Sequence, residues 1–472
     1  MTKKILLINP AQFQPIAANQ PEIYDKEIDY LPSLGILYLA AYLKKFNDCE
    51  IKIADCGVEN ISYDEIGRLA KEFQPDIIGI TALTFVLLDV MAIIKSIKAA
   101  LPDTPIVLGG AHPNLYPDET INLPGVDFII LGEGEKPFKE LIDNINDREK
   151  LKTIPGIVFK SNGQIINTGH CGLINNLDEL PFPARQLTKY DKYFSIIAQK
   201  SPVTTMFTSR GCPYRCLFCD RPHLGKVFRA RSANNVVDEM AEIKKMGIEE
   251  IFIYDDTFTI NRQRTVDICR EIINRKLKIN WDIRARVNTV DEELLHLLKM
   301  AGCQRIHFGV EAGTQKILDA LKKDITLEMV EKAIRWTKKE GIETLAYFMI
   351  GNPSETLDDI KQTIKFAKKL DPDYINVSIT TPFPGTQLYA LALEKGIIKT
   401  DVWREFAANP AAQFIPPLWT ENFTRDELLA LMRKFYASFY RRPKYIIKKL
   451  LAVRSWDELA RKAKAGWQVL KF

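Results

Sequence analysis

The sequence has no long apolar run. None of its apolar stretches approaches the roughly 18 residues that a membrane-spanning helix needs. Near the amino terminus, residues 5–8 give only four successive apolar positions before Asn9, too few for the core of a signal peptide. We therefore expect a cytoplasmic protein.

A disulfide framework and a strong charge bias are also missing. Five of the eight cysteines stand singly along the 472 residues, which is typical of reduced thiols in a cytosolic protein. These are Cys49, Cys56, Cys171, Cys269 and Cys303. The formal net charge is only +5, so the overall charge gives no indication of nucleic-acid binding.

Residues 1–145 alternate short apolar runs with amphipathic segments, which predicts strands alternating with helices. Residues 63–73, for example, carry apolar side chains at helical spacing. The runs that we expect to be buried strands are residues 4–9, 51–55, 76–81, 105–110 and 127–135. Strands in this alternation predict an α/β domain with a doubly wound, flavodoxin-like parallel sheet.

The loops after these strands are rich in small and polar residues. In doubly wound sheets, the loops at the carboxyl ends of the strands form the ligand crevice. The candidate binding residues in these loops are Thr81, Thr84, Gly109, Gly110, Gly132, Glu133 and Gly134. No GxGxxG motif follows the first strand, which disfavours a dinucleotide as the ligand.

The rest of the chain divides into a linker, a second α/β domain and a helical end. Residues 146–200 are expected to form a linker with a β-hairpin that turns at residues 161–163, followed by an extended stretch over residues 177–187. Residues 201–400 contain six further strand candidates that alternate with helices, which predicts a partial TIM barrel, (β/α)6. Residues 401–472 are expected to be helical and to end in a basic tail.

Three cysteines, Cys212, Cys216 and Cys219, lie within eight residues directly after the first strand of this second series. Chemistry in α/β barrels takes place at this end of the strands. Three thiolates that hold a [4Fe–4S] cluster leave one iron free to bind a substrate, whereas ordinary clusters use four. The alternatives are three buried apolar side chains, or a zinc site completed by a distant histidine or cysteine.

The spacing C-x3-C-x-aromatic-C, with Phe218 as the aromatic residue, resembles the signature of the radical S-adenosylmethionine (SAM) superfamily. Residues 251–261, 284–288, 306–314 and 348–356 stand at the strand ends where that superfamily places its SAM contacts, so the resemblance covers most of the chain. It implies that SAM binds the open iron through its amino and carboxylate groups. One electron then cleaves SAM to methionine and a 5′-deoxyadenosyl radical.

The resemblance also suggests which residues contact SAM. Asp255 and Asp256 are candidates to accept hydrogen bonds from its ammonium group. Arg286 is a candidate partner of its carboxylate, and Glu311 a candidate acceptor from its ribose hydroxyls. Gly351 would let the backbone approach the adenine. Alternatively, the charged residues form salt bridges at the rim of the barrel.

Residues 108–119 and 127–141 resemble loops that surround the nucleotide tail of cobalamin in the B12-dependent class of this superfamily. The crevice residues of the first domain are then candidate cobalamin contacts. The D-x-H-x-x-G motif, whose histidine coordinates cobalt, is absent, and His112 stands in a different context. We therefore expect cobalamin without a protein histidine on cobalt. Arg229 and Arg231, which follow the cysteines, either face a cofactor or are solvated.

Within this class, the sequence most resembles the anaerobic magnesium-protoporphyrin monomethyl ester oxidative cyclases and the hopanoid-biosynthesis enzymes. The resemblance implies modification of an unactivated carbon of a lipid-like or tetrapyrrole substrate, with ferredoxin or flavodoxin as electron donor. The modification is methylation, ring formation or carbon–carbon coupling. The alternatives are an RNA- or peptide-modifying enzyme and a non-catalytic cobalamin or iron–sulfur sensor. RNA is disfavoured because neither a TRAM-like β-barrel nor a second cysteine cluster occurs in the sequence.

The carboxyl-terminal tail is the one strongly basic segment. Residues 441–472 carry ten basic and two acidic side chains, a net charge of +8, with Trp456 and Trp467 among them. Such a segment is often a solvated helix face. A basic amphipathic helix also binds anionic membrane surfaces, so the tail predicts a peripheral membrane contact.

Overall fold

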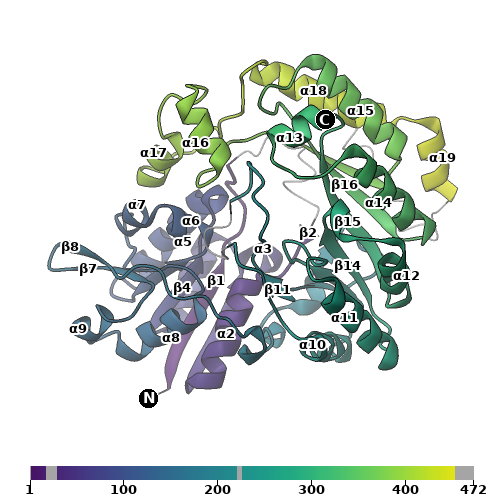
Figure 1. Ribbon diagram of the computed structural model, residues 1–472. Coiled ribbons are helices and arrows are strands. Elements are labelled where there is room, and N and C mark those ends of the chain that lie inside the picture. The colour runs from purple at the N-terminus through teal and green to yellow at the C-terminus, as the bar shows by residue number, and fades with distance from the viewer. Residues whose placement is uncertain (1, 17–28, 221–225, 452–472) are drawn as a thin grey trace.

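The computed structural model describes residues 2–16, 29–220 and 226–451. Over these residues two large sheets lie beside one another, the first from the amino-terminal part of the chain and the second from its middle (Figure 1). Helices from the carboxyl-terminal part run along the top of both sheets in that view. The described chain is therefore built of two adjoining α/β units and a helical end.

Seven strands of the described chain form the first sheet, in the order β3-β1-β4-β5-β6-β7-β8. They are β1 (Lys3–Asn9), β3 (Cys49–Asp55), β4 (Ile77–Thr81), β5 (Ile106–Gly109), β6 (Phe128–Ile130), β7 (Ile157–Ser161) and β8 (Gln164–Asn167). The strands from β3 to β6 are parallel, which confirms the predicted doubly wound sheet. The expected hairpin forms from β7 and β8 and extends this same sheet, because β7 pairs antiparallel with β6 and covers its edge.

Helices cover both faces of the first sheet. Their bounds are α2 (Leu34–Phe46), α3 (Cys56–Glu59), α4 (Tyr63–Phe73), α5 (Leu87–Ala100), α6 (Ala111–Leu115), α7 (Pro117–Ile121), α8 (Glu135–Asn144) and α9 (Arg148–Leu151). On β1, Ile5 and Leu7 are buried in the core on one face, and Leu6 and Ile8 in the core on the other. A continuous apolar run is what a parallel strand needs when both of its faces are covered.

Six parallel strands of the described chain form the second sheet, in sequence order. They are β10 (Val203–Met206), β13 (Glu250–Ile253), β14 (Asn280–Ala285), β15 (Cys303–Glu311), β16 (Glu343–Ile350) and β17 (Tyr374–Ile379). The helices between them are α10 (Ala233–Lys245), α11 (Arg262–Asn274), α12 (Glu292–Met300), α13 (Gln315–Ala320), α14 (Leu327–Lys339) and α15 (Leu357–Leu370). The predicted partial barrel is confirmed.

Alternate residues of the second sheet face the helices. On β14, Trp281 and Ile283 are fully buried in the core between sheet and helices. The Trp281 Nε1 donates a hydrogen bond to the Ala301 carbonyl at 2.9 Å. Because side chains alternate along a strand, Asp282 and Arg284 point to the opposite, inner face of the half barrel.

The segment between the two sheets is more ordered than the extended linker expected for residues 177–187. Two short 3-10 turns, Leu177–Glu179 and Arg185–Leu187, occur in it. Buried Arg185 pairs with Glu239 at 2.6 Å and donates to the Thr205 carbonyl at 2.8 Å. The ion pair attaches the segment to α10, and the hydrogen bond attaches it to β10. Sequence periodicity alone does not reveal either contact.

Four helices of the described chain follow the last strand, and one of them, α18, covers the open edge of the half barrel. They are α16 (Gln387–Glu394), α17 (Val402–Ala408), α18 (Arg425–Tyr440) and α19 (Pro443–Leu451). The backbone N–H groups of Val377 and Ile375 on edge strand β17 donate to the hydroxyls of Tyr436 and Tyr440 at 2.8 and 3.0 Å. Helix α18 thereby satisfies groups that would otherwise offer this edge to another strand.

The first part of the basic tail packs on the barrel. The Tyr445 hydroxyl donates to the Asp373 carbonyl at 2.9 Å, and Lys448 pairs with the Asp373 carboxylate at 3.0 Å. Arg442 pairs with Asp371 at 2.9 Å. Trp456 and Trp467 lie outside the described residues. Within the described residues, no helix combines the length and apolar character needed to cross a bilayer.

Candidate active site

The three clustered cysteines lie on a loop at the carboxyl end of β10. Cys212 and Cys216 are buried, Cys219 is half-buried, and all three are free thiols. Gly211 has φ of +81°, in the left-handed region that favours glycine, and it turns the chain into the loop. The Leu217 N–H donates to the Leu321 carbonyl and the Leu217 carbonyl accepts from the Leu388 N–H, both at 3.0 Å. The loop is therefore fixed from two sides.

The arrangement of the thiols bears on the choice between an iron–sulfur cluster and zinc. Among the described residues, no three His, Cys, Asp or Glu side chains converge to hold a single metal ion. A cube of four irons spaces its thiolate ligands farther apart than one zinc ion does at about 2.3 Å. Three free thiols on one fixed loop fit such a cluster.

Asp255 anchors the entry to this loop. It is fully buried, and its carboxylate accepts hydrogen bonds from the backbone N–H groups of Thr208 and Ser209 at 2.6 and 3.0 Å. The hydroxyls of Thr208 and Ser209 donate to its other oxygen. The expected contact of Asp255 with the SAM ammonium is therefore corrected, because the carboxylate is occupied in positioning the residues before Cys212. Asp256 is exposed.

Arg286 lies against the cysteine loop. Its Nη1 is 3.4 Å from the Cys216 sulfur, and its Nη2 donates to the Lys323 carbonyl. The guanidinium stacks over the Tyr214 ring at 3.8 Å from the ring centroid. This buried cation suits a metal-bound thiolate, which carries negative charge. The sequence predicted a partner for the SAM carboxylate, and the structure brings Arg286 to Cys216.

Glu311 ends β15 in an unusual backbone conformation. Its φ is +67°, and the pairing with β16 is interrupted between Gly309 and Glu311. The Glu311 carboxylate accepts from the Lys323 Nζ at 2.6 Å, and that ammonium lies 5.7 Å from the centroid of the Phe218 ring. Strained non-glycine residues of this kind cluster at functional sites. The pair places Glu311 beside the cysteine loop.

Gly351 lets helix α18 approach the chain closely. Its φ is +74°, and an added Cβ would lie 2.8 Å from Leu428 of α18. Leu428 therefore accounts for the glycine, and the approach of its backbone to adenine stays a prediction. The following loop is held by Glu355, whose Oε2 accepts from the Asn352 N–H at 2.8 Å. Burial raises the pKa of Glu355 to about 7, a feature that the sequence did not reveal.

Only some of the residues predicted to line the crevice of the first domain are accessible there. Thr81, Gly109 and Gly110 are partly exposed, and an added Cβ at Gly109 would meet no atom within 4 Å. This open space beside small residues fits the approach of a large cofactor. Thr84 instead turns inward, with its hydroxyl 3.0 Å from the His112 Nδ1. His112 is fully buried, and burial lowers its pKa to about 4, so the imidazole is an interior neutral group.

The loop after β6 has a different role from the one expected. Glu133 pairs with Arg210 and with Arg229, both at 2.8 Å, and Glu135 pairs with Arg210 at 2.6 Å. All four side chains are buried. Arg210 ends the short strand β11 (Ser209–Arg210), which pairs with β12 (Arg229–Ala230). Glu133 is thus removed from the candidate cobalamin contacts, because its carboxylate joins the first domain to the strand that enters the cysteine loop.

Neighbouring residues support this junction. Burial acts to raise the pKa of Glu133, but the hydrogen bond from Arg229 and the charge of Arg210 outweigh it and lower the pKa. Gly132 lies against Cys171, since an added Cβ would be 2.8 Å from that sulfur, and Gly134 lies against Leu39, at 3.3 Å. Neither glycine faces the open space beside Gly109.

Arg231, the second arginine after the cysteines, faces neither cofactor nor solvent. It is buried and forms an ion pair with Glu239 of α10. Its Nη1 also donates to the Phe207 carbonyl at 2.9 Å. Both interactions fix the chain on either side of the cysteine loop.

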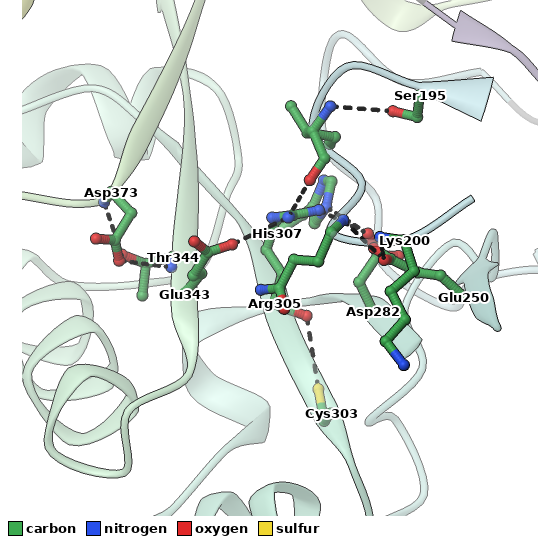
Figure 2. A network of polar contacts seen from close by, with 12 residues as sticks. Ser195, Lys200, Glu250, Asp282, Cys303, Arg305, His307, Glu343, Thr344 and Asp373 are labelled. Atoms are coloured by element: carbon green, nitrogen blue, oxygen red, sulfur yellow. Dashed lines mark hydrogen bonds and ion pairs between the residues drawn. The ribbon is translucent and has the colours of Figure 1, made fainter. Parts of the chain in front are cut away.

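A buried polar network closes the amino-terminal end of the half barrel (Figure 2). Arg305 is fully buried and pairs with Glu343 at 2.9 Å and with Asp282 at 3.5 Å. The Glu250 carboxylate accepts from the backbone N–H groups of residues 199 and 200 at 2.8 and 2.9 Å. Burial raises the pKa of Glu250 to about 7. Sequence reasoning missed this network; its only signal was charged residues at alternate positions of otherwise apolar strands.

Comparison with protein-family models gives two matches. Residues 206–367 match the radical SAM superfamily, and residues 29–142 match the B12 binding domain. The first match begins at the end of β10 and includes the cysteine loop, Asp255, Arg286 and Glu311. The second covers most of the first sheet.

Relatives and solved structures agree with these matches. An uncharacterised methyltransferase of Pyrococcus horikoshii is 38% identical over 420 residues, which cover 88% of this chain and 89% of that protein. The anaerobic magnesium-protoporphyrin IX monomethyl ester cyclase of Rubrivivax gelatinosus is 31% identical over 366 residues, covering 76% of this chain and 66% of that one. The cobalamin-dependent SAM radical enzyme OxsB, solved with aqua-cobalamin and SAM, shares the fold with a TM-score of 0.75 at 20% identity, covering 98% of this chain and 70% of that one.

The two matched domains define the cofactors, which are a [4Fe–4S] cluster, SAM and cobalamin. The donor set agrees with them, because three free thiols share one loop and open space borders Gly109. The chain belongs to the cobalamin-dependent radical SAM enzymes, of the methyltransferase or cyclase type.

Proposed function

We propose that this enzyme methylates, or closes a ring at, an unactivated carbon of a hydrophobic substrate of lipid-like or tetrapyrrole type. The observation that carries the proposal is the junction of Glu133 and Glu135 with Arg210. It brings the loops of the B12 binding domain next to the cysteine loop, two residues before Cys212. A substrate carbon between the two cofactors would be within reach of both.

The residues divide into cluster ligands and groups that support them. Cys212, Cys216 and Cys219 would hold the cluster, with Arg286 offsetting the negative charge at Cys216. When bound, the cluster supplies one electron for the cleavage of SAM, and cobalamin supplies a methyl carrier. Glu311 remains our candidate for the SAM ribose, since it lies beside the loop on the inner side of the half barrel.

Thr81, Gly109 and Gly110 are the candidate cobalamin contacts in the first crevice. The open space at Gly109 supports this role. We also expect an electron donor such as ferredoxin or flavodoxin, because the reduction of SAM consumes an electron that the chain itself does not supply. A buried His112 supports binding of cobalamin without a protein imidazole on cobalt.

Support for a hydrophobic substrate comes from two sources. The half-buried rings of Tyr254, Tyr347 and Tyr374 belong to the inner face of the half barrel, where they offer apolar surface. Among the relatives, one is named a methyltransferase and one a cyclase of a magnesium protoporphyrin ester, which favours methyl transfer or ring formation.

A peripheral membrane contact of the tail would bring such a substrate close. Because Arg442 and Lys448 are paired with aspartates, the attraction to anionic lipid would rest on the other basic residues of the tail, and Ile446 and Ile447 of α19, which are 45% and 58% exposed, would add apolar contacts. Salt-sensitive co-sedimentation with anionic vesicles, lost after removal of residues 441–472, is the expected result. An intact protein that ignores such vesicles at low salt would contradict the contact.

The catalytic proposal is tested with protein reconstituted anaerobically with cluster and cobalamin. Reduction in the presence of SAM labelled in its methyl group should give 5′-deoxyadenosine, with label in a metabolite of a cell extract if the reaction is methylation and in methionine alone if it closes a ring. The variant Cys216→Ala should give neither product. Cys269→Ala is the matched control, since Cys269 is an equally buried free thiol on α11, away from the loop. A protein with intact cluster and cobalamin that cleaves no SAM would be a sensor, and the proposal would fail.

A further inference from the structure

A row of partly exposed side chains crosses the inner face of the half barrel. We call Tyr254, Arg284, Gly309, Tyr347 and Asn376 the inner band. In the strand registers Arg284 pairs with His307, whereas Gly309, two residues farther along β15, pairs with Tyr347, and Tyr347 pairs with Asn376. The band therefore crosses adjacent strands with a step of two residues between β14 and β15. Each member is partly exposed, although all but Asn376, on edge strand β17, belong to a central strand or directly follow a strand. The band therefore borders accessible space.

The band lies between two closed regions. Arg286 follows directly after β14 in extended backbone, two residues and about 7 Å beyond Arg284, and it contacts Cys216. In the other direction, Asp282 belongs to the buried network that closes the barrel (Figure 2). A molecule on the band would thus reach toward the cysteine loop at one end only.

Arg284 is the one cation among the five residues of the inner band. Its Nη1 donates to the Ile253 carbonyl at 3.1 Å, and its guanidinium stacks on the Tyr254 ring at 3.7 Å from the ring centroid. No carboxylate of the described residues forms an ion pair with it. By contrast, Arg305 on the neighbouring strand has Glu343 at 2.9 Å. A planar guanidinium that makes no direct ion pair is suited to bind a carboxylate or phosphate.

The other side of the band is fixed by a hydrogen-bonded chain. The His307 Nε2 is 3.2 Å from the Asp282 carboxylate, and its Nδ1 is 3.0 Å from the Tyr347 hydroxyl. Burial lowers the pKa of His307 despite the opposing effect of Asp282, so the neutral imidazole donates from Nε2 and accepts from Tyr347 at Nδ1. The Tyr347 proton is then engaged. Arg284 is left as the cationic donor of the band.

We propose that Arg284 binds an anionic group, a carboxylate or a phosphate, of the substrate, with the Tyr254 and Tyr347 rings beside it. This inference rests on the proposed function, because it assigns the inner band to the substrate of that reaction. A hydrophobic substrate with one acidic group would be held by its anion at Arg284 and would extend toward the cysteine loop. The carboxylate of SAM is the other source of the same chemistry, so the test must separate the two.

The test uses calorimetric titration of the reconstituted holoenzyme, with and without saturating SAM. Benzoate and phenyl phosphate are the anionic probes, and benzamide is the neutral control. With SAM bound, at least one of the two anions should bind the wild type. Arg284→Met should weaken that binding at least tenfold, or about 1.4 kcal/mol. Arg284→Lys should weaken the binding less, since lysine keeps the positive charge but lacks the planar guanidinium that donates two parallel hydrogen bonds. Arg275→Met is the matched control, because Arg275 pairs with Asp238 and Glu271 on the outer surface, and it should bind like the wild type.

Three outcomes would overturn the inference. The first is that the anions bind no better than benzamide, and the second is that they bind Arg284→Met as tightly as the wild type. The third is that saturating SAM displaces them, which would identify Arg284 as a SAM contact. Equal melting temperatures of the variants exclude unfolding as the cause of a loss. Formation of 5′-deoxyadenosine is measured in parallel. If the wild type cleaves no SAM yet binds the anions through Arg284, the proposed function fails while the anion site remains.

Discussion

Replacement of Arg210 by methionine tests the junction between the two domains. The substitution removes one cation from a buried group of four charges and keeps an unbranched apolar side chain. Glu133 retains Arg229 at 2.8 Å, whereas Glu135 loses the partner that it has at 2.6 Å. One carboxylate is therefore left buried and uncompensated.

The size of the effect follows from that imbalance. Removal of one partner of a buried ion pair costs about 3–5 kcal/mol. Because Glu133 stays paired, we expect the lower end, about 3 kcal/mol, a factor of roughly one hundred in the unfolding equilibrium. Adding Glu135→Gln removes the unpaired charge and should restore part of the loss, since the two sites are in contact.

The assay is urea unfolding of the holoenzyme, together with the yield of 5′-deoxyadenosine. Arg262→Met is the matched control, because Arg262 also bridges two carboxylates, Asp291 and Glu293, but its side chain is 46% exposed. Water screens the ion pairs of Arg262, so their loss should lower the free energy of unfolding far less. The reasoning is refuted if Arg210→Met and Arg262→Met destabilise the protein equally, or if Glu135→Gln does not compensate.

Three further predictions concern the cofactors and one buried acid. Alanine at Cys212, Cys216 or Cys219 should abolish the visible absorption of the cluster and SAM cleavage together, and stoichiometric zinc with little iron in the wild type would contradict the assignment. Electron paramagnetic resonance of the Co(II) form should lack superhyperfine coupling to a protein imidazole, since His112 is buried; such coupling would contradict us. Burial raises the folded pKa of Glu355 to about 7 from 4.5, so its contribution to stability should be full below pH 4.5 and lost as the pH rises through 7. Glu355→Gln should flatten that part of the stability profile, and an unchanged profile would refute the assignment.

The sequence was sufficient for the elements and for the cysteine loop because both are coded locally. Apolar runs of four to eight residues between amphipathic segments gave the strands of both sheets, and the spacing of Cys212, Cys216 and Cys219 gave the loop. The hairpin was also predicted from its turn. Its membership of the first sheet was not, because pairing of β7 with β6 depends on a contact across the intervening helix α8.

The roles of individual charged residues could not be read in the same way. Asp255 and Glu133 stand at strand ends, as cofactor ligands do, but their partners are Thr208, Ser209, Arg210 and Arg229, whose positions only the folded chain defines. A carboxylate that ends a strand is equally suited to bind a ligand or to hold a neighbouring loop. Burial and pairing decide between these roles, and neither is visible in one sequence.

The most direct test of the central claim is electron–nuclear double resonance of the reduced, reconstituted enzyme with SAM carrying ¹⁵N in its amino group. Three cysteine ligands leave one iron open, so the account predicts a ¹⁵N coupling from SAM bound to the cluster. The same experiment on Arg284→Met should retain the coupling, because we assign that residue to the substrate. A wild-type cluster whose spectrum is unchanged by SAM and shows no ¹⁵N coupling would contradict the account.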